Sequence, residues 1–403
     1  MVTKKRRLDG SRSIVYGVTV GVSAYSLLKG QLQWFSTRGW KVTLVSDPDD
    51  KALAASRREG VNFEPLSMRR GISLVQDPFS LWCWIRLLRR LSPDATNVGT
   101  PKAGLLGGFA AWLTRVPRRV YVVRGLRLEG VDGPLLPVLW LMERLSTTFA
   151  TDVVVVSESL GRELVRRRLT NPKKTWLIGS GSSNGVDVEK IEDRVSATDA
   201  GQLRSDLGIS ADSFVVGFIG RVNRDKGFDT LVRAMTSGEL AEHVRLLVIG
   251  PVEDTALAGL LGSQESRVIF IEWTNDVWAY LSVIDTLVLP TRREGFPNVV
   301  LEAASARVPT ITTRATGATD SVLDGETGYQ VDIDDSVALT RRINQFAATP
   351  ELAREMGQRA YERVRTEFKP ESIWQGLAEI IEGRAVSEHV VRLEQPNVTN
   401  RKS

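Results

Sequence analysis

The sequence predicts an α/β protein made of two Rossmann-like halves, each with a parallel sheet between helices. Short apolar segments alternate with helix-like segments, which is typical of a doubly wound parallel sheet. The alternation pauses near residue 189 and starts again at residue 213. The length of 403 residues suits two domains, each able to bury a core of its own.

The first half, residues 13–200, is expected to form the N-terminal domain behind a basic arm at residues 1–12. Its strands should be short and mostly apolar, as strands buried on both faces are. Helices are expected at about 23–38 and over 79–91. We place the strands at 14–20, 41–46, 95–98, 118–123, 152–156 and 175–178.

The second half, residues 207–369, should repeat this pattern after a charged linker at about 189–206. A C-terminal helix is expected at 370–384 and a flexible tail at 385–403. The predicted strands are 213–219, 244–249, 268–271, 285–290 and 309–313, with a last one after the turn at 325–329.

Composition limits the chemistry. Cys83 is the single cysteine of the sequence, which excludes an internal disulfide and a cysteine-based zinc site and fits a reducing cytoplasm. His243 and His389 are its two histidines, so histidine-based and metal-based catalysis are disfavoured. No stretch approaches the roughly 20 apolar residues of a membrane-spanning helix, and the N-terminus lacks an apolar segment suited to secretion.

The net charge of +5 is unevenly distributed. Residues 1–200 contain 31 Lys and Arg against 19 Asp and Glu, which favours an anionic surface or an acidic substrate. The predicted helix at 79–91 has an apolar face and several arginines, with Trp82 off that face. It is expected either to pack on the sheet with a solvated basic side or also to touch a membrane surface.

Three turns of the first half are candidate ligand-binding sites. Gly21 belongs to a loose relative of a phosphate-binding glycine loop that lacks the third glycine, so dinucleotide binding is not expected. Thr100 and Lys102 open a helix where backbone N–H groups could converge on an anion, which indicates an acceptor-side or helix-capping role. The acidic turn at 47–50 could hold a divalent metal, but a proline-centred turn is its commoner meaning.

In the second half, Arg221 and Lys226 flank the turn after the first strand, where open sheets bind ligands. Two fixed cations there suit a diphosphate, although each alone is more often a surface charge. Trp273 follows the third strand, where it could stack on a nucleobase or pack in the core.

The segment 291–302 is the centre of the second half. Glu294 lies in its loop and Glu302 about one turn inside the helix that Pro297 begins. A carboxylate accepts two coplanar hydrogen bonds, which matches the vicinal hydroxyls of ribose or a sugar ring. Taken singly, each glutamate is more often a solvated charge.

The combined motifs resemble the donor-binding half of the family-4 retaining glycosyltransferases with the GT-B fold. They are Gly220-Arg221, Lys226-Gly227, the stretch from Glu294 through Gly295, Phe296, Pro297 and Asn298 to Glu302, and Gly325-Glu326-Thr327-Gly328. The first half resembles the branch that extends polyprenyl-diphosphate-linked sugars, through Leu27-Leu28-Lys29-Gly30-Gln31 and the segments 100–107 and 179–187.

The resemblance implies two Rossmann-like domains whose parallel sheets face across a cleft. The first is expected to bind the acceptor and the second a nucleotide sugar, with a UDP-linked sugar favoured. It implies that Arg221 and Lys226 hold the donor diphosphate, Glu302 the ribose and Glu294 the donor sugar. The backbone from Gly295 to Asn298 and the side chain of Trp273 would complete the donor site, with Gly21 beside it. No metal and no cofactor beyond the co-substrate are expected.

One departure from the family concerns Arg124, which stands where a histidine is common. Arginine cannot act as a base near neutral pH because its pKa stays above about 12. In this fold, retaining transfer is thought to use an oxygen of the leaving diphosphate as the proton acceptor, so the histidine is dispensable. Arg124 could instead hold a phosphate or a sugar hydroxyl on the acceptor side.

The favoured function is retaining transfer from a nucleotide sugar to a lipid-diphosphate-linked saccharide, at the inner face of the membrane, by a cytoplasmic peripheral protein. Two alternatives keep the fold: an epimerase or hydrolase of nucleotide sugars, and a non-catalytic sugar-nucleotide binder within a membrane glycosylation complex. Nucleic-acid binding is disfavoured because the basic residues lack interleaved aromatic residues or a reader motif.

Overall fold

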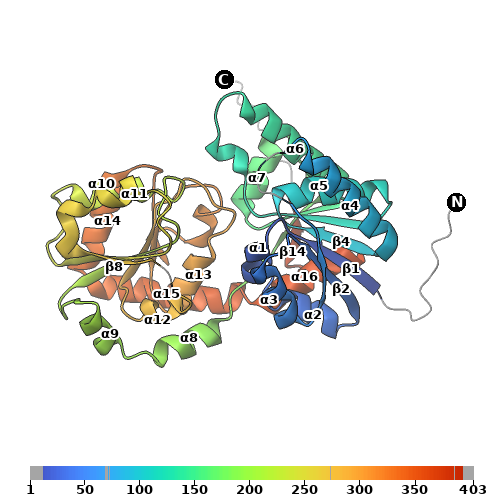
Figure 1. Cartoon of the computed structure of the whole chain (residues 1–403). Coiled ribbons are helices and arrows are strands. Elements are labelled where there is room, and N and C mark those ends of the chain that lie inside the picture. The colour runs from blue at the N-terminus through green and yellow to red at the C-terminus, as the bar shows by residue number, and fades with distance from the viewer. Residues whose placement is uncertain (1–11, 69–70, 72, 273, 385, 394–403) are drawn as a thin grey trace, which may run out of the picture. The chain divides into compact units, whose positions relative to one another are not determined.

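The computed structural model describes residues 12–68, 71, 73–272, 274–384 and 386–393, and its chain divides into two compact units. One unit contains Met1–Gly179 together with Pro370–Ser403, and the other contains Ser180–Lys369. The boundary therefore falls earlier than the linker expected at 189–206. The C-terminal helix α16 (Pro370–Glu382) belongs to the N-terminal unit (Figure 1).

The N-terminal unit has an eight-stranded sheet in the order β14-β7-β6-β5-β4-β1-β2-β3. All neighbours pair in parallel except β14, which is antiparallel to β7. The strands are β1 (Arg12–Gly17), β2 (Trp40–Ser46), β3 (Asn62–Pro65), β4 (Ala95–Val98), β5 (Arg118–Val123), β6 (Asp152–Val155), β7 (Thr175–Ile178) and β14 (Val390–Arg392).

Helices cover both faces of this sheet (Figure 1). One face carries α4 (Gln76–Leu91), α5 (Pro101–Leu113) and α6 (Leu135–Phe149), and Trp84 of α4 is fully buried there. The other face carries α1 (Gly21–Leu27), α2 (Gln31–Thr37), α3 (Asp50–Glu59) and α16, while α7 (Glu158–Arg166) follows β6. The strand order places a topological switch point between β1 and β4.

The C-terminal unit has six parallel strands in the order β10-β9-β8-β11-β12-β13, with a switch point between β8 and β11. The strands are β8 (Phe214–Ile219), β9 (Val244–Ile249), β10 (Val268–Ile271), β11 (Thr286–Leu289), β12 (Thr310–Thr313) and β13 (Gly328–Val331). The helices are α8 (Val188–Ser196), α9 (Ala200–Asp206), α10 (Phe228–Thr236), α11 (Thr255–Gly259), α12 (Val277–Leu281), α13 (Asn298–Ser305), α14 (Ser336–Ala348) and α15 (Pro350–Glu367).

Three local expectations were wrong. The helix expected over 23–38 is two helices, because Gly30 adopts a left-handed φ of 78° between α1 and α2. A side chain at Gly30 would also meet Trp374, whose ring lies 2.8 Å from the position of a Cβ atom. The expected linker forms α8 and α9, and the expected flexible tail contributes β14. Most of the basic arm and residues 394–403 lie outside the described residues.

Candidate active site

Two loops meet at the switch point of the C-terminal sheet. One runs from Gly220 to Gly227 after β8, and the other from Pro290 to Pro297 after β11. They approach so closely that a Cβ atom at Gly227 would lie 1.7 Å from the carbonyl oxygen of Pro290. Gly227 also has a left-handed φ of 66°, so both the backbone and the space require glycine here.

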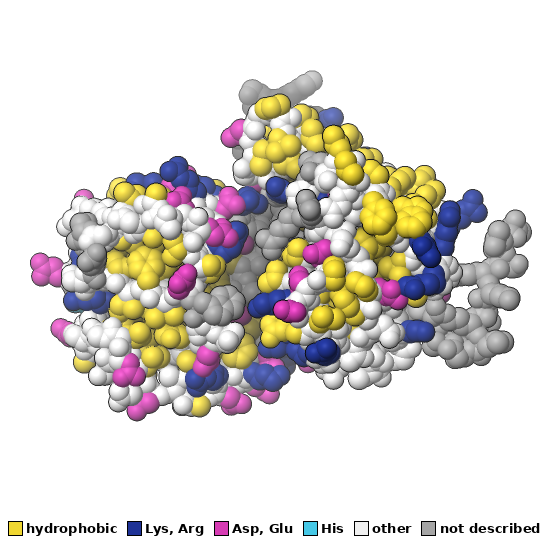
Figure 2. All heavy atoms as spheres, viewed as in Figure 1, with side chains coloured by type: hydrophobic (Ala, Val, Ile, Leu, Met, Phe, Trp, Pro, Cys, Tyr) yellow, Lys and Arg dark blue, Asp and Glu magenta, His cyan; other side chains and the backbone are white. Residues whose placement is uncertain are grey.

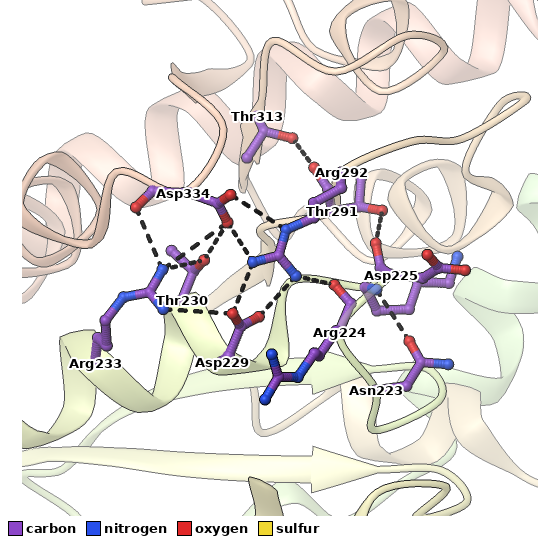
Figure 3. A network of polar contacts seen from close by, with 11 residues as sticks. Asn223, Arg224, Asp225, Asp229, Thr230, Arg233, Thr291, Arg292, Thr313 and Asp334 are labelled. Carbon is purple, nitrogen blue, oxygen red and sulfur yellow. Dashed lines mark hydrogen bonds and ion pairs between the residues drawn. The ribbon is translucent and has the colours of Figure 1, made fainter. Parts of the chain in front are cut away.

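Polar contacts join these two loops along their length (Figure 3). The backbone N–H of Arg292 donates to the carbonyl oxygen of Asp225 at 3.0 Å, and the hydroxyl of Thr291 donates to the same oxygen at 3.2 Å. The guanidinium of Arg293 donates to the carboxylate of Asp225 at 2.5 Å. The loop after β11 is therefore fixed against the loop after β8.

Arg292 extends this network to a third loop (Figure 3). Its guanidinium donates to both carboxylate oxygens of Asp229 at 2.9 and 2.7 Å, and to those of Asp334 at 3.2 and 2.6 Å. Hydrogen bonds to Asp229 raise the pKa of Arg292. Burial opposes ionisation of Asp229, but the hydrogen bonds and charge of Arg292 lower its pKa overall. Arg292 thus joins the loop after β11, the start of α10 and the loop after β13.

Lys226 and Glu294 are brought together by these loops. The Nζ of Lys226 donates to Oε1 of Glu294, and the two side chains are 22% and 13% exposed. The backbone of Lys226 is fixed by Asn223, whose Oδ1 accepts from its N–H at 3.0 Å. A partly buried cation and carboxylate therefore lie side by side at the carboxyl end of β8 and β11.

Arg221 lies on the same loop but is more exposed. Its Nη1 donates to both oxygens of Glu253 at 3.1 and 2.9 Å, and Asn223 donates to Glu253 at 2.6 Å. Glu253 follows β9 and was not singled out from the sequence. An exposed glutamate in a loop gives no signal of its own, because its partner lies 32 positions away.

The remaining donor-side residues surround the start of α13. Gly295, Phe296 and Pro297 are buried, and Phe296 packs against Phe368 with ring centroids 5.4 Å apart. The helix begins at Asn298 with Pro297 as its N-cap, one residue later than expected.

Glu302 follows within α13 and is half-buried. Asn298, at the first position of the helix, has a buried Oδ1 without a hydrogen-bond partner among the described residues. Trp273 lies outside the described residues.

In the N-terminal unit, Lys102 and Thr100 are engaged by the protein. Lys102 is buried, and its Nζ donates to Asp77 of α4 at 2.7 Å and to the carbonyl oxygen of Gly71. The Thr100 hydroxyl accepts from the N–H of Thr19 at 3.0 Å and lies 2.7 Å from the Thr19 hydroxyl. These contacts tie the loops after β1 and β4 together.

Gly21 is held beside the acidic turn. Its N–H donates to Oδ2 of Asp49 at 2.9 Å, and Asp49 caps α3 by accepting from Ala52 at 2.8 Å. Asp47 accepts from the N–H of Met68 at 3.0 Å. Both aspartates thus stabilise turns, and within the described ranges no group of three or more His, Cys, Asp or Glu residues is arranged to hold a metal ion.

The fold and this site define a class: a two-domain glycosyltransferase of the GT-B type. Residues 199–363 match the family described as glycosyl transferases group 1, and residues 21–179 match the glycosyl transferase 4-like domain. The capsular polysaccharide biosynthesis glycosyltransferase CapM of Staphylococcus aureus is 36% identical, over 91% of this chain and 96% of its own length. The chain therefore belongs to the group 1 glycosyltransferases and is a glycosyltransferase.

Two further likenesses are informative. The Escherichia coli UDP-Gal:alpha-D-GlcNAc-diphosphoundecaprenol alpha-1,3-galactosyltransferase is 27% identical, over 66% of this chain and 69% of its own length. The crystal structure of Anabaena Alr3699/HepE in complex with UDP superposes with a TM-score of 0.77, at 19% identity, over 92% of this chain and all of that one. The latter likeness supports the GT-B fold.

Proposed function

We propose that this glycosyltransferase moves a sugar, with retention of configuration, from a UDP-linked donor to a saccharide on a lipid diphosphate during assembly of a surface polysaccharide. The observation that carries the proposal is the pairing of Lys226 with Glu294 at the switch point of the C-terminal sheet. The acceptor class is supported by the named activity of the related galactosyltransferase, and the pathway by that of CapM.

On the donor side, Lys226 and Arg221 would bind the diphosphate, and Glu294 would bind hydroxyls of the sugar. Glu302 would accept from the ribose hydroxyls, and the backbone from Gly295 to Asn298 would line the sugar. Each cation already has a carboxylate partner, Glu294 or Glu253. A diphosphate arriving there would share these cations and release each carboxylate to accept from hydroxyl groups.

In the reaction, the bond between the anomeric carbon and the diphosphate oxygen breaks while the acceptor oxygen bonds to that carbon on the same face. The acceptor proton passes to an oxygen of the departing diphosphate. Negative charge therefore grows on the diphosphate, and Lys226 and Arg221 are the groups placed to stabilise it. Lys226, the more buried of the two, should contribute more because its surroundings screen charge less.

A membrane-facing surface on α4, α5 and α6 would serve a lipid-linked acceptor. Exposed apolar side chains gather on this part of the N-terminal unit, with arginine beside them (Figure 2). The Trp82 ring is 53% exposed, stacks on Phe79 at 5.9 Å and lies 5.5 Å below the guanidinium of Arg86. The other exposed apolar residues there are Leu74, Val75, Trp112, Leu113, Leu135, Val138 and Leu141.

These side chains suit a lipid interface, because aromatic rings and arginines together bind the headgroup region of anionic membranes. Leu74, Val75, Phe79 and Trp82 belong to or precede the first turns of α4, which begins at the carboxyl end of the sheet. The lipid surface would thus meet the edge of the sheet at which ligands bind in this fold. No helix of the described residues is long and apolar enough to cross a membrane.

The test measures release of nucleoside diphosphate from a panel of UDP- and GDP-sugars, with and without a polyprenyl-diphosphate saccharide. It compares wild type with Glu294→Gln and with the exposed control Glu351→Gln. We expect acceptor-dependent release from a UDP-sugar that is lost in Glu294→Gln and kept in Glu351→Gln. Release without acceptor would support the hydrolase or epimerase alternative. Nucleotide binding without turnover for every donor would support the non-catalytic binder.

A further inference from the structure

Arg124 directly follows β5, and no carboxylate among the described residues is paired with it. Its Nη1 donates to the carbonyl oxygen of Gly99 at 3.0 Å. Its Nε is buried and has no hydrogen-bond partner among the described residues. Within the same residues, no carboxylate pairs with Arg124 or influences its ionisation.

The ionisable groups nearest to this guanidinium are phenols. Tyr16 and Tyr121 are both buried, and burial raises the pKa of each, so both are neutral. Burial lowers the pKa of Arg124 to about 10, which leaves it cationic near neutral pH. A partly desolvated cation without a counter-ion is costly to the folded state. A ligand that supplies the missing negative charge would remove that cost.

The surrounding loops hold this guanidinium at the switch point of the N-terminal sheet. β4 lies between β5 and β1, and the loops after β1 and β4 are joined by Thr19 and Thr100. A Cβ atom at Gly99 would lie 1.6 Å from Nη1 of Arg124, so the guanidinium occupies space that only glycine leaves open. Lys102, the neighbouring cation of this loop, is already paired with Asp77.

We propose that Arg124 binds phosphate oxygens of a substrate diphosphate, which makes the end of β5 an anion site of the N-terminal unit. The inference rests on the proposed function for its ligand, which is the diphosphate of the lipid-linked acceptor. Arg124 uses Nη1 for the carbonyl oxygen of Gly99, and the N–H groups of Nη1 and Nη2 lie in one plane that matches two oxygens of a phosphate. Lys102 and Thr100 are assigned a different task, which is to hold the loop against which Arg124 rests.

The test measures calorimetric binding of farnesyl diphosphate and of UDP to the full chain as wild type, Arg124→Gln and Gly99→Ala. Arg127→Gln, an exposed arginine three positions on, is the matched control. Loss of a charged hydrogen-bond donor should weaken binding about ten- to hundredfold. Gly99→Ala should have a similar effect, because its methyl group displaces the guanidinium. Weaker binding of farnesyl diphosphate with unchanged binding of UDP is the expected result, and weaker binding of UDP alone would contradict a site for the acceptor diphosphate.

Stability gives an independent readout. If Arg124 serves to bind a ligand, the melting temperature of Arg124→Gln without added ligand should equal or exceed that of wild type. The reason is that the substitution removes an uncompensated charge. A purely structural arginine would give a lower melting temperature. Unchanged affinity for both diphosphates in Arg124→Gln, or the same loss in Arg127→Gln, would overturn the proposal. That failure is distinct from failure of the proposed function, which is judged by sugar transfer in wild type.

Discussion

Lys226 and Glu294 carry opposite charges, and under the proposed function both bind substrate. Each satisfies the other, so neither is left as an unpaired charge in a partly buried site. Under the proposed function, substrate binding would replace this ion pair by two sets of contacts, with phosphate oxygens on the lysine and sugar hydroxyls on the glutamate. The ion pair would thus stabilise the loops and also hold both side chains where the substrate binds.

We predict that Lys226→Ala lowers kcat/KM about a hundredfold, because removal of one preorganised donor to a developing negative charge typically costs about 3 kcal/mol. Steady-state kinetics of acceptor-dependent UDP release would measure it. Lys190→Ala, which removes an exposed lysine of the same unit, is the control. A Lys226→Ala enzyme within twofold of wild type would show that the lysine does not act on the leaving group.

Glu143 gives a prediction about stability and pH. It is buried on α6, it accepts from the Tyr121 hydroxyl at 2.9 Å, and burial raises its pKa from 4.5 to about 7. The folded state therefore binds a proton that the unfolded chain has lost between pH 4.5 and 7, so stability falls as pH rises through this window.

Glu143→Gln removes this proton linkage and keeps an acceptor for Tyr121. We compare the free energy of unfolding of the variant with that of wild type at each pH. This difference should shift in favour of the variant by up to about 3 kcal/mol between pH 5 and pH 8. Urea unfolding at the two pH values measures the difference, with the exposed Glu158→Gln as control. An equal effect of Glu143→Gln at both pH values would contradict the raised pKa.

At the scale of elements, Arg292 holds together the loop after β11, the start of α10 and the loop after β13. This side chain bonds Asp229 at the start of α10 and Asp334 after β13, while its own backbone lies two residues from Glu294. Thr313, which ends β12, also donates to the carbonyl oxygen of Thr291 in the same loop (Figure 3). The position of Glu294 is thus supported by contacts that α10, β12 and the loop after β13 make with its loop.

We predict that Arg292→Ala lowers kcat about ten- to hundredfold, since displacing a catalytic loop by about 1 Å can cost two orders of magnitude. Arg292→Lys should not restore kcat, because a lysine cannot make two bidentate contacts. Kinetics and thermal melting would be measured together, with Arg314→Ala, which removes an exposed ion-pair network, as control. Equal kcat in Arg292→Ala and Arg314→Ala would argue against a positioning role.

The sequence was informative about elements whose signal is local. The strands expected at 95–98, 118–123, 175–178, 244–249 and 268–271 agree with β4, β5, β7, β9 and β10, because apolar runs between turn residues determine them. β3 and β14 were missed, since they are short edge strands of mixed polarity stabilised by pairing with distant segments. The break between α1 and α2 occurs at Gly30, whose left-handed φ and close approach to Trp374, more than 300 residues away, have no local sequence signal.

The candidate site was likewise predictable only where its signal is local in the sequence. The family resemblance assigned Lys226 and Glu294 to one donor site, and the structure pairs their side chains. The sequence could not show that Lys102 pairs with Asp77, because both lie in different helices and such ion pairs have no sequence signal. It also gave no reason to select Glu253 or Asp334, whose roles depend on loops brought together only by the strand order.

For the whole molecule, the uneven charge and the apolar surface on α4, α5 and α6 lead to a prediction about membranes. The purified protein should bind vesicles containing anionic lipid, and bind less as salt rises, because surface charges are screened beyond about 10 Å at 0.1 M salt. A vesicle of neutral lipid should bind more weakly, since it lacks the attraction to the basic half. Vesicle sedimentation at 50 and 500 mM salt, chosen to lie on either side of about 0.1 M, would measure this.

The contribution of the apolar surface to vesicle binding is tested with the double variant Trp82→Ser and Trp112→Ser, which replaces two exposed tryptophans. Leu260→Ser on the C-terminal unit is the matched control. If these rings enter the lipid interface, the double variant should lose about tenfold or more in vesicle affinity, while the control keeps it. Turnover of a water-soluble short-chain acceptor should stay near the wild-type value in both variants. Vesicle affinity that is unchanged in the double variant would mean that the surface on α4, α5 and α6 faces another partner.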